Sequence, residues 1–191
     1  MASPVHLLGI SGSLRRRSFN TALLRAAGEM LPESVTLDIT DLAPIPFYNE
    51  DIEQEQGFPE PVQHLRAAIA ACDAILFAVP EYNYSITGVL KNAIDWASRS
   101  GPGPRAPSPL RQKPFGMMGV GSVFGTVRAQ MHMRQITLHN DMRALSKPDV
   151  LLARAGDKFD ADLRLTDEPT RKMVGELVVA LVAWTRQLRG G

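Results

Sequence analysis

The sequence has one cysteine, Cys72, among 191 residues, no long hydrophobic run and no excess of either charge. A single cysteine excludes an internal disulfide, and with it a disulfide-stapled secreted scaffold. The longest apolar runs fall well short of the roughly 20 residues that a membrane-spanning helix needs. With 21 basic and 20 acidic residues, the net charge of +1 gives no general attraction to nucleic acid or to an anionic membrane.

The composition that remains is typical of a globular domain. Hydrophobic residues make up 45% and charged residues 21% of the chain, a balance that argues against disorder. A chain of this length buries about 70% of its surface on folding, so its core needs neither metals nor disulfides. We expect a single domain over residues 1–191. Because no secretory leader precedes the first apolar run, we expect a cytoplasmic location.

Short apolar runs alternate with longer segments of helical periodicity. Strands are predicted at 4–10, 35–39, 74–79, 114–120 and 149–153, and helices at 18–31, 61–72, 86–98, 125–145 and 168–188. Thr166 or Asp167 is the expected cap of the last helix. Three of the strands are almost wholly apolar, as parallel strands covered on both faces are. The alternation predicts an α/β fold with a doubly wound, five-stranded parallel sheet of order 2-1-3-4-5 and helices on both faces.

In that topology, a ligand binds beyond the carboxyl ends of the first, third and fourth strands. The residues after Ile10, Val79 and Val120 are therefore the candidate site. A proline- and glycine-rich segment at 101–109 predicts a stiff surface loop, either a spacer or a flap over that site.

Small and hydroxyl-bearing residues follow the first strand, from Ser11 to Asn20. Such a turn points backbone N–H groups inward at a helix N-terminus, which suits a terminal phosphate without a metal. Arg15 is the arginine that we expect to reach the phosphate. The alternative is an ordinary turn with a capping serine. A P-loop is excluded because the turn has no lysine, and a dinucleotide fingerprint lacks its glycines, although Asp38 would suit a ribose hydroxyl.

The second segment, Pro80 to Ser85, suits a planar heteroaromatic ring. Pro80, Tyr82 and Tyr84 offer a flat stacking surface, and Asn83 offers polar groups for the ring edge. The tyrosines have an alternative role as buried packing residues. Glu81 is either a general base or a charge that complements the dipole of the following helix.

In the third segment, Gly121, Ser122 and Gly125 permit close approach of the backbone to a ring, or simply form a flexible loop. His132 and His139 follow on the predicted helix with no carboxylate or cysteine at ligand spacing. We therefore expect no metal site there, and favour a subunit interface or a hydrated face.

Together these segments resemble the NADPH-dependent FMN reductases of flavodoxin-like fold, most closely the bacterial quinone and chromate reductases, which are related to azoreductases. The resemblance spans nearly the whole chain. It is carried by the runs Gly12 to Arg15, Ser18 to Asn20, Pro80 to Ser85 and Lys91 to Trp96.

The resemblance implies bound FMN and assigns its contacts to particular residues. Phosphate contacts fall to Ser13, Arg15, Ser18, Phe19 through its backbone, and Asn20. Isoalloxazine contacts fall to Pro80, Glu81, Tyr82 and Asn83, and a third-loop contact falls to Ser122 or the Gly121 backbone.

The resemblance also implies the reaction. NADPH or NADH would pass a hydride to FMN, and a quinone-like, azo, chromate or flavin acceptor would then be reduced in a ping-pong sequence. The chemistry belongs to the flavin, so no catalytic side chain is expected. A rim of arginines at 15–17 offers a place for the 2′-phosphate of NADPH. The family's dimers and tetramers imply a homo-oligomer. The alternatives are a flavodoxin-type electron carrier without its own turnover, and a Rossmann-type reductase without flavin.

Overall fold

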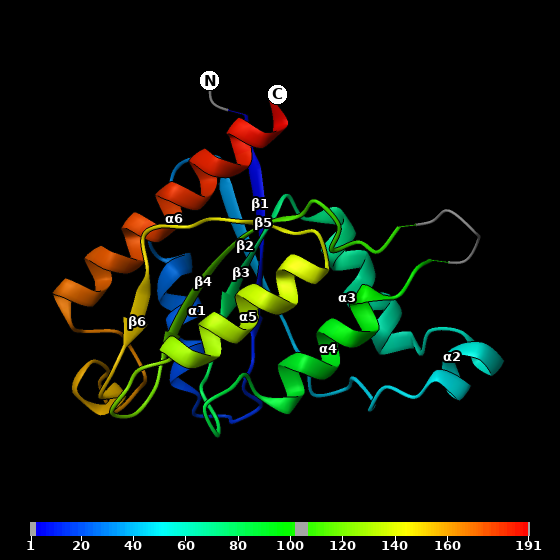
Figure 1. Ribbon diagram of the computed structural model, residues 1–191. Coiled ribbons are helices and arrows are strands. Elements are labelled where there is room, and N and C mark those ends of the chain that lie inside the picture. Colours follow the sequence, from blue (N-terminus) through cyan, green and yellow to red (C-terminus); the bar gives the residue numbers. More distant parts are fainter. Residues whose placement is uncertain (1–2, 102–106, 191) are drawn as a thin grey trace.

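The computed structural model describes residues 3–101 and 107–190, which form a parallel β-sheet flanked by helices (Figure 1). The strand order is β2-β1-β3-β4-β5, and β6 also pairs with β4. Every strand pair is parallel. The strands are β1 (Val5–Ser11), β2 (Val35–Thr40), β3 (Ala74–Ala78), β4 (Pro114–Val120), β5 (Arg143–Ala144) and β6 (Val150–Leu152). The predicted α/β class and order 2-1-3-4-5 are therefore confirmed.

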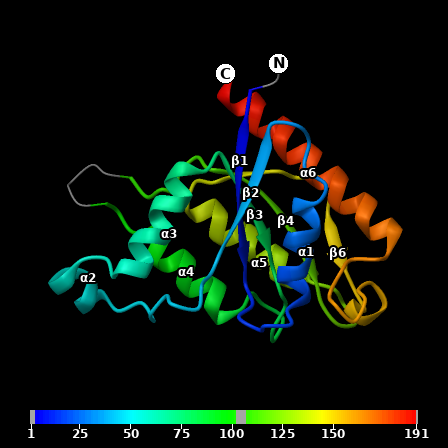
Figure 2. The ribbon, with the colours of Figure 1, turned by 180° about the vertical axis from the view of Figure 1, so that it is seen from behind.

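Helices cover both faces of this sheet. They are α1 (Phe19–Gly28), α2 (Glu50–Gln56), α3 (Glu60–Ala71), α4 (Gly88–Ser98), α5 (Val127–His139) and α6 (Glu168–Arg189), with a 3-10 turn η1 (Ala155–Asp157). One buried cluster joins the sheet to α1 and α6, and a second joins it to α3, α4 and α5. Figures 1 and 2 show α1 and α6 on one side of the strands and α3 and α4 on the other.

The fifth position of the sheet differs from the prediction. Two short strands share it, since β5 pairs with the start of β4 and β6 pairs with its end. The predicted helix at 125–145 was too long, because α5 ends at His139 and Asp141 adopts a left-handed φ of 52°. That turn releases residues 143–144 to join the sheet edge.

Two further elements carry no periodic apolar signal and were not predicted. Helix α2 has no buried residue and is capped by the Asn49 side chain, which accepts a hydrogen bond from the Asp51 N–H at 2.9 Å. The turn η1 follows β6 directly. Of the segment predicted as a stiff loop, residues 102–106 lie outside the described residues.

Candidate functional site

The loops after β1, β3 and β4 meet at the carboxyl ends of the strands, on the side of the sheet opposite the chain termini and at the bottom of Figure 1. They enclose a cleft of about 380 Å³. This volume lies in the range of small-molecule sites. The residues that line the cleft are Ser13, Arg15, Ser18, Phe19, Asn20, Pro80, Glu81, Tyr82, Val120, Gly121, Ser122 and Ala155.

The first loop presents a row of free backbone donors to the cleft. Ser18 caps α1, its hydroxyl accepting from the Thr21 N–H at 3.2 Å. Within the described part of the chain, the N–H groups of residues 16–20 have no acceptor, and Ser18, Phe19 and Asn20 of this run line the cleft. Unpaired N–H groups at a helix N-terminus carry partial positive charge and bind anions. The loop is thus a turn with a capping serine, as the alternative has it, and it also leaves several N–H donors without a protein acceptor.

Side chains of the same loop add further donors. Arg15 is exposed, and its guanidinium group has no acidic partner among the described residues, so it is free to reach an anion. The Ser13 hydroxyl accepts from the Arg15 N–H at 3.4 Å and keeps its own proton for a ligand. Arg17 is committed elsewhere, since its guanidinium group donates to the Ala161 carbonyl at 2.6 Å.

Asn20 lines the cleft but uses its side chain to join two loops. Its Nδ2 donates to the Val120 carbonyl at 2.9 Å, and its Oδ1 accepts from the Val120 N–H at 3.1 Å. The side chain is buried, and this pair of bonds links the start of α1 to the end of β4. Any phosphate contact from Asn20 would therefore come through its backbone N–H.

The second loop contributes Pro80 and Tyr82 to the wall of the cleft. A side chain on Gly12 would approach the Pro80 ring to 2.7 Å, so the missing Cβ lets the first two loops pack tightly. The Thr87 hydroxyl donates to the Gly12 carbonyl at 2.7 Å and fixes the same contact. Tyr82 is 53% exposed and Tyr84 is 61% exposed, so the alternative of buried packing tyrosines is wrong.

Asn83 is the predicted site residue that the structure does not bring into the cleft. It occupies the turn of a small hairpin in which Tyr82 and Ser85 exchange backbone hydrogen bonds of 3.0 Å. Asn83 and Tyr84 have positive φ values of 51° and 66°, a conformation that asparagine adopts readily. The turn needs Asn83 for its backbone conformation, and the predicted ring contact stays a prediction.

The Glu81 carboxylate is fixed by contacts with the first residues of α5. Its carboxylate accepts from the backbone N–H groups of Arg128 at 2.9 Å and Ala129 at 3.2 Å, and it pairs with the Arg128 guanidinium group at 3.4 Å. It thus caps α5, for which Thr126 supplies no side-chain cap. We predicted that the Glu81 charge would complement the dipole of the helix that follows it in sequence, which is α4. The carboxylate instead lies at the N-terminus of α5, further along the chain.

Arg128 connects the second and third loops. Its guanidinium carbon lies 4.1 Å from the centre of the Tyr84 ring and 4.8 Å from that of Phe124. With Glu81 beneath it, this stack fixes the spacing between the two loops on either side of the cleft.

In the third loop, the glycines serve close approach of the chain to itself. A side chain on Gly121 would meet the Gly125 carbonyl oxygen at 2.3 Å, and the Gly121 N–H already donates to the Leu152 carbonyl at 2.9 Å. Ser122 has no acceptor for its N–H or hydroxyl among the described residues and faces the cleft. Of the two predicted third-loop contacts, Ser122 is thus the one with free donors.

Ten of the eleven residues predicted for the site line this one cleft. Two further lining residues, Val120 and Ala155, were not predicted. Ala155 arrives from η1 after β6, a segment without a sequence signal. Within the described residues, no group of three or more His, Cys, Asp or Glu side chains is arranged to hold a metal ion. Cys72 lies in the core, where burial raises the pKa of its thiol to about 11, so it remains protonated at neutral pH.

Fold and cleft together define a flavodoxin-like α/β domain with a cleft at the carboxyl ends of its strands, lined by free backbone N–H donors and by the exposed Tyr82 ring. The family model described as NADPH-dependent FMN reductase matches residues 5–157. The chain belongs to this family.

Similar proteins cover the whole chain. An NAD(P)H-dependent FMN reductase of Pseudomonas aeruginosa is 44% identical over 191 residues, which is 100% of both chains. An NAD(P)H:quinone oxidoreductase of Solanum tuberosum is 42% identical and covers 99% of this chain and 97% of its own. Among solved structures, the flavoenzyme NAD(P)H:(acceptor) oxidoreductase FerB of Paracoccus denitrificans aligns with a TM-score of 0.84 at 30% identity, over 96% of this chain and 98% of FerB. In residues 3–101 and 107–190, no helix is long and apolar enough to cross a membrane.

Proposed function

We propose that this chain, acting as a single domain, is an FMN-dependent oxidoreductase that takes electrons from NADPH or NADH and delivers them to quinone-like acceptors. The observation that carries the proposal is that Ser18, Phe19 and Asn20, whose N–H groups are free, line the same cleft as Pro80 and Tyr82. Family membership and the names of the similar proteins support the same activity.

The residues of the cleft divide the work of holding FMN. The free N–H groups, with the hydroxyls of Ser13 and Ser18 and the Arg15 guanidinium group, would bind the phosphate. Pro80 and Tyr82 would support the ring system, and Ser122 would donate to it from the opposite loop. Glu81 and Arg128 keep the two walls at the right spacing.

The protein's contribution to catalysis is binding and orientation. When bound, FMN supplies the redox chemistry, the uptake of a hydride from the nicotinamide and the release of two electrons to an acceptor. Glu81 is the one carboxylate among the described residues that lines the cleft, and it is already bonded to two backbone N–H groups. It is therefore poorly placed to serve as a general base.

Quinones are the acceptors favoured by the names of similar proteins, which include a 2-hydroxy-1,4-benzoquinone reductase of Burkholderia that is 35% identical over 182 residues. Azo compounds, chromate and free flavin stay predictions. Family membership favours a reductase with its own turnover over a flavodoxin-type carrier. Family membership likewise disfavours a Rossmann-type reductase without flavin; its candidate ribose ligand, the Asp38 carboxylate, pairs with the His6 ring at 2.8 Å through one of its oxygens.

The proposal is tested by one spectroscopic experiment on the purified chain with FMN added. We expect a yellow complex that NADPH bleaches under anaerobic conditions and that a quinone reoxidises over repeated turnovers. A colourless protein that takes up no FMN would contradict the proposal. Bound flavin with no NADPH consumption would favour the carrier.

Site variants locate the phosphate. Arg15→Ala and Ser18→Ala should each weaken FMN binding by about 1.5–3 kcal/mol for each lost charge-assisted hydrogen bond. Measurement is by fluorescence titration of FMN into flavin-free protein, and unchanged affinity in both variants would refute the phosphate assignment.

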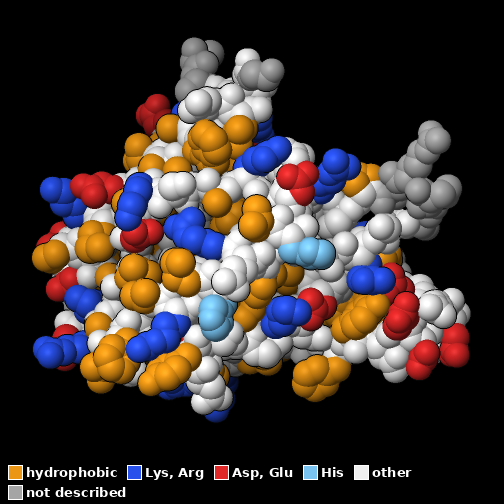
Figure 3. Space-filling model, viewed as in Figure 1, with side chains coloured by type: hydrophobic (Ala, Val, Ile, Leu, Met, Phe, Trp, Pro, Cys, Tyr) orange, Lys and Arg blue, Asp and Glu red, His pale blue; other side chains and the backbone are white. Residues whose placement is uncertain are grey.

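We also propose that the chain works as a homo-oligomer in the cytoplasm. Hydrophobic side chains at Phe124, Val127, Met131 and Leu138 are between 45% and 80% exposed along α5 and the loop before it. Figure 3 shows hydrophobic and basic side chains mingled over the face that carries α5. A second copy of the chain would cover such a surface.

A further inference from the structure

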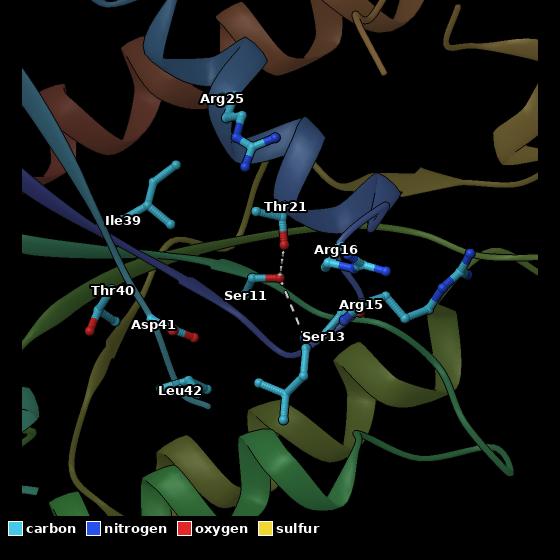
Figure 4. A pocket seen from close by; sticks show the side chains of 11 residues that line it. Ser11, Ser13, Arg15, Arg16, Thr21, Arg25, Ile39, Thr40, Asp41 and Leu42 are labelled. Atoms are coloured by element: carbon cyan, nitrogen blue, oxygen red, sulfur yellow. Dashed lines mark hydrogen bonds between the residues drawn. The ribbon is translucent and has the colours of Figure 1, made fainter. Parts of the chain in front are cut away.

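A second cavity of about 320 Å³ lies beside the flavin cleft, where α1 crosses the end of β2 (Figure 4). The two cavities share Ser13 and Arg15 as a common wall. A ligand that lies against bound FMN and extends over this wall would enter the second cavity. The residues that line it are Ser11, Ser13, Leu14, Arg15, Arg16, Thr21, Arg25, Ile39, Thr40, Asp41 and Leu42.

The second cavity is lined by arginine side chains that have no partner in the described part of the chain. In the described part of the chain, five arginines have guanidinium groups without a hydrogen bond or ion pair, and three of them line it: Arg15, Arg16 and Arg25. Arg25 lies in the last turn of α1, and helical side chains lean toward the helix N-terminus, which here opens on the cavity. Figure 4 shows Arg25 above Thr21, opposite Ile39 and Thr40, whereas the Arg15 side chain extends away from them.

The other wall combines apolar and polar groups. Leu14 is 48% exposed and Ile39 is 38% exposed, which provides apolar surface for a purine ring. Thr40 adds a hydroxyl at the end of β2. The Asp41 carboxylate accepts from the Ala43 N–H at 2.9 Å, and its other oxygen is free for a ribose hydroxyl or an exocyclic amine.

We propose that this cavity binds the adenosine 2′-phosphate end of NADPH, with Arg25 as the residue that distinguishes NADPH from NADH. The inference rests on the proposed function and names the determinant of its nucleotide choice. The Arg25 guanidinium group pairs with the 2′-phosphate, and the Arg16 side chain adds charge from the loop. The purine lies against Ile39 and Leu14. NADH presents a 2′-hydroxyl there and gains nothing from Arg25.

Arg25 is the residue to vary, because it has no part in the flavin cleft and lies on an exposed helix surface. In the FMN-loaded enzyme, we expect Arg25→Gln to raise KM for NADPH by about tenfold, the loss of one charge-assisted contact, and to leave KM for NADH unchanged. Arg25→Glu should raise KM for NADPH further, and Arg25→Lys should retain part of the preference. Arg164→Gln is the matched control, since Arg164 is another exposed arginine without a partner among the described residues and lines neither cavity.

A binding measurement without turnover completes the test. Calorimetric titration of FMN-loaded protein should show that adenosine 2′-phosphate binds more tightly than adenosine 5′-phosphate, and Arg25→Gln should abolish the difference. The inference is overturned if Arg25→Gln and Arg25→Glu change KM for both nucleotides alike, or if the two adenosine phosphates bind equally well. Wild-type protein that oxidises neither nucleotide would instead refute the proposed function.

Discussion

At the scale of single residues, the polar side chains of the cleft are split between the ligand and the protein itself. Asn20 and Glu81 line the cleft, but the side chains of both form hydrogen bonds with backbone groups of other elements. Ser13, Ser18 and Arg15 keep protons free for a ligand. Residue type and position alone did not separate these two groups, because the partners of Asn20 and Glu81 lie 100 and 47 residues away in the chain.

Replacing Asn20 tests this division. Asn20→Ala leaves the buried N–H and carbonyl groups of Val120 without partners, so we expect the flavin-free protein to lose about 2–3 kcal/mol of unfolding free energy. Urea denaturation followed by circular dichroism measures the loss.

Asn140→Ala is the control, because the Asn140 Nδ2 makes a single, partly buried bond of 2.8 Å to the Ile136 carbonyl. It should cost about 1 kcal/mol or less. If Asn20→Ala lowered FMN affinity while the flavin-free protein kept its stability, the loop-joining role would be wrong.

At the scale of elements, the helix ends that were predicted correctly are those whose capping residues are close in sequence. Asp167 caps α6 as expected, accepting from the Thr170 N–H at 3.0 Å, with Pro169 in the first turn and Gly190 at the other end. These capping residues lie within a few positions of the helix ends, so the sequence was enough to predict them. Helix α5 has a remote cap in Glu81 instead, and its end was misplaced because residues after His139 turn toward the sheet edge.

The cap of α6 makes part of the stability depend on pH. Hydrogen bonds from the Thr170 hydroxyl and N–H, and then the nearby Lys158, lower the pKa of the Asp167 carboxyl. A carboxyl whose pKa is lowered by folding stabilises the folded state above its unfolded pKa of about 3.9. That contribution is lost as the pH falls through this value toward the lower folded one.

We therefore expect the melting temperature of the wild type to exceed that of Asp167→Asn at pH 6, and the difference to shrink as the pH falls below about 4. Thermal unfolding monitored by circular dichroism across this range is the measurement. Asparagine still caps a helix, so the variant folds. A gap between the curves that stays constant with pH would show that the carboxylate charge is unimportant.

At the scale of the whole molecule, the sheet separates the site from the chain ends. The two chain ends are joined by hydrogen bonds, from the Arg186 guanidinium group to the Ser3 carbonyl at 2.9 Å and from the Arg189 guanidinium group to the Pro4 carbonyl at 3.0 Å. The site lies on the opposite side of the sheet, as Figure 1 shows. The surface of α5 adjoins the site through Arg128, so an oligomer built on α5 would place a second copy near the cleft.

That surface gives a prediction for the assembly. Met131→Glu with Leu138→Glu should lower the molar mass measured by light scattering, because two charges would have to be buried in the interface. Val179→Glu is the control, since Val179 is a 55% exposed hydrophobic residue on α6. A wild-type protein that is monomeric and fully active at working concentration would contradict the proposed oligomer.

The sequence by itself determined the fold class, the strand order and the three loops of the site. These follow from local properties: apolar runs for buried strands, helical periodicity, and small or hydroxyl-bearing residues after particular strands. Because parallel strands bring their carboxyl ends to one edge, correct strand order was enough to bring Ser18, Tyr82 and Ser122 to one cleft.

Only the tertiary structure decided what each polar group in that cleft does. Asn20, Glu81 and Gly121 found partners in distant loops, Asn83 was taken by a turn, and Ala155 joined the cleft from a segment without a signal. It also disclosed the second cavity, where Arg25 and Ile39 meet across α1 and β2. The physical reason is that hydrogen bonds and charge pairs depend on distances between atoms, which the chain sets only when its packing is complete.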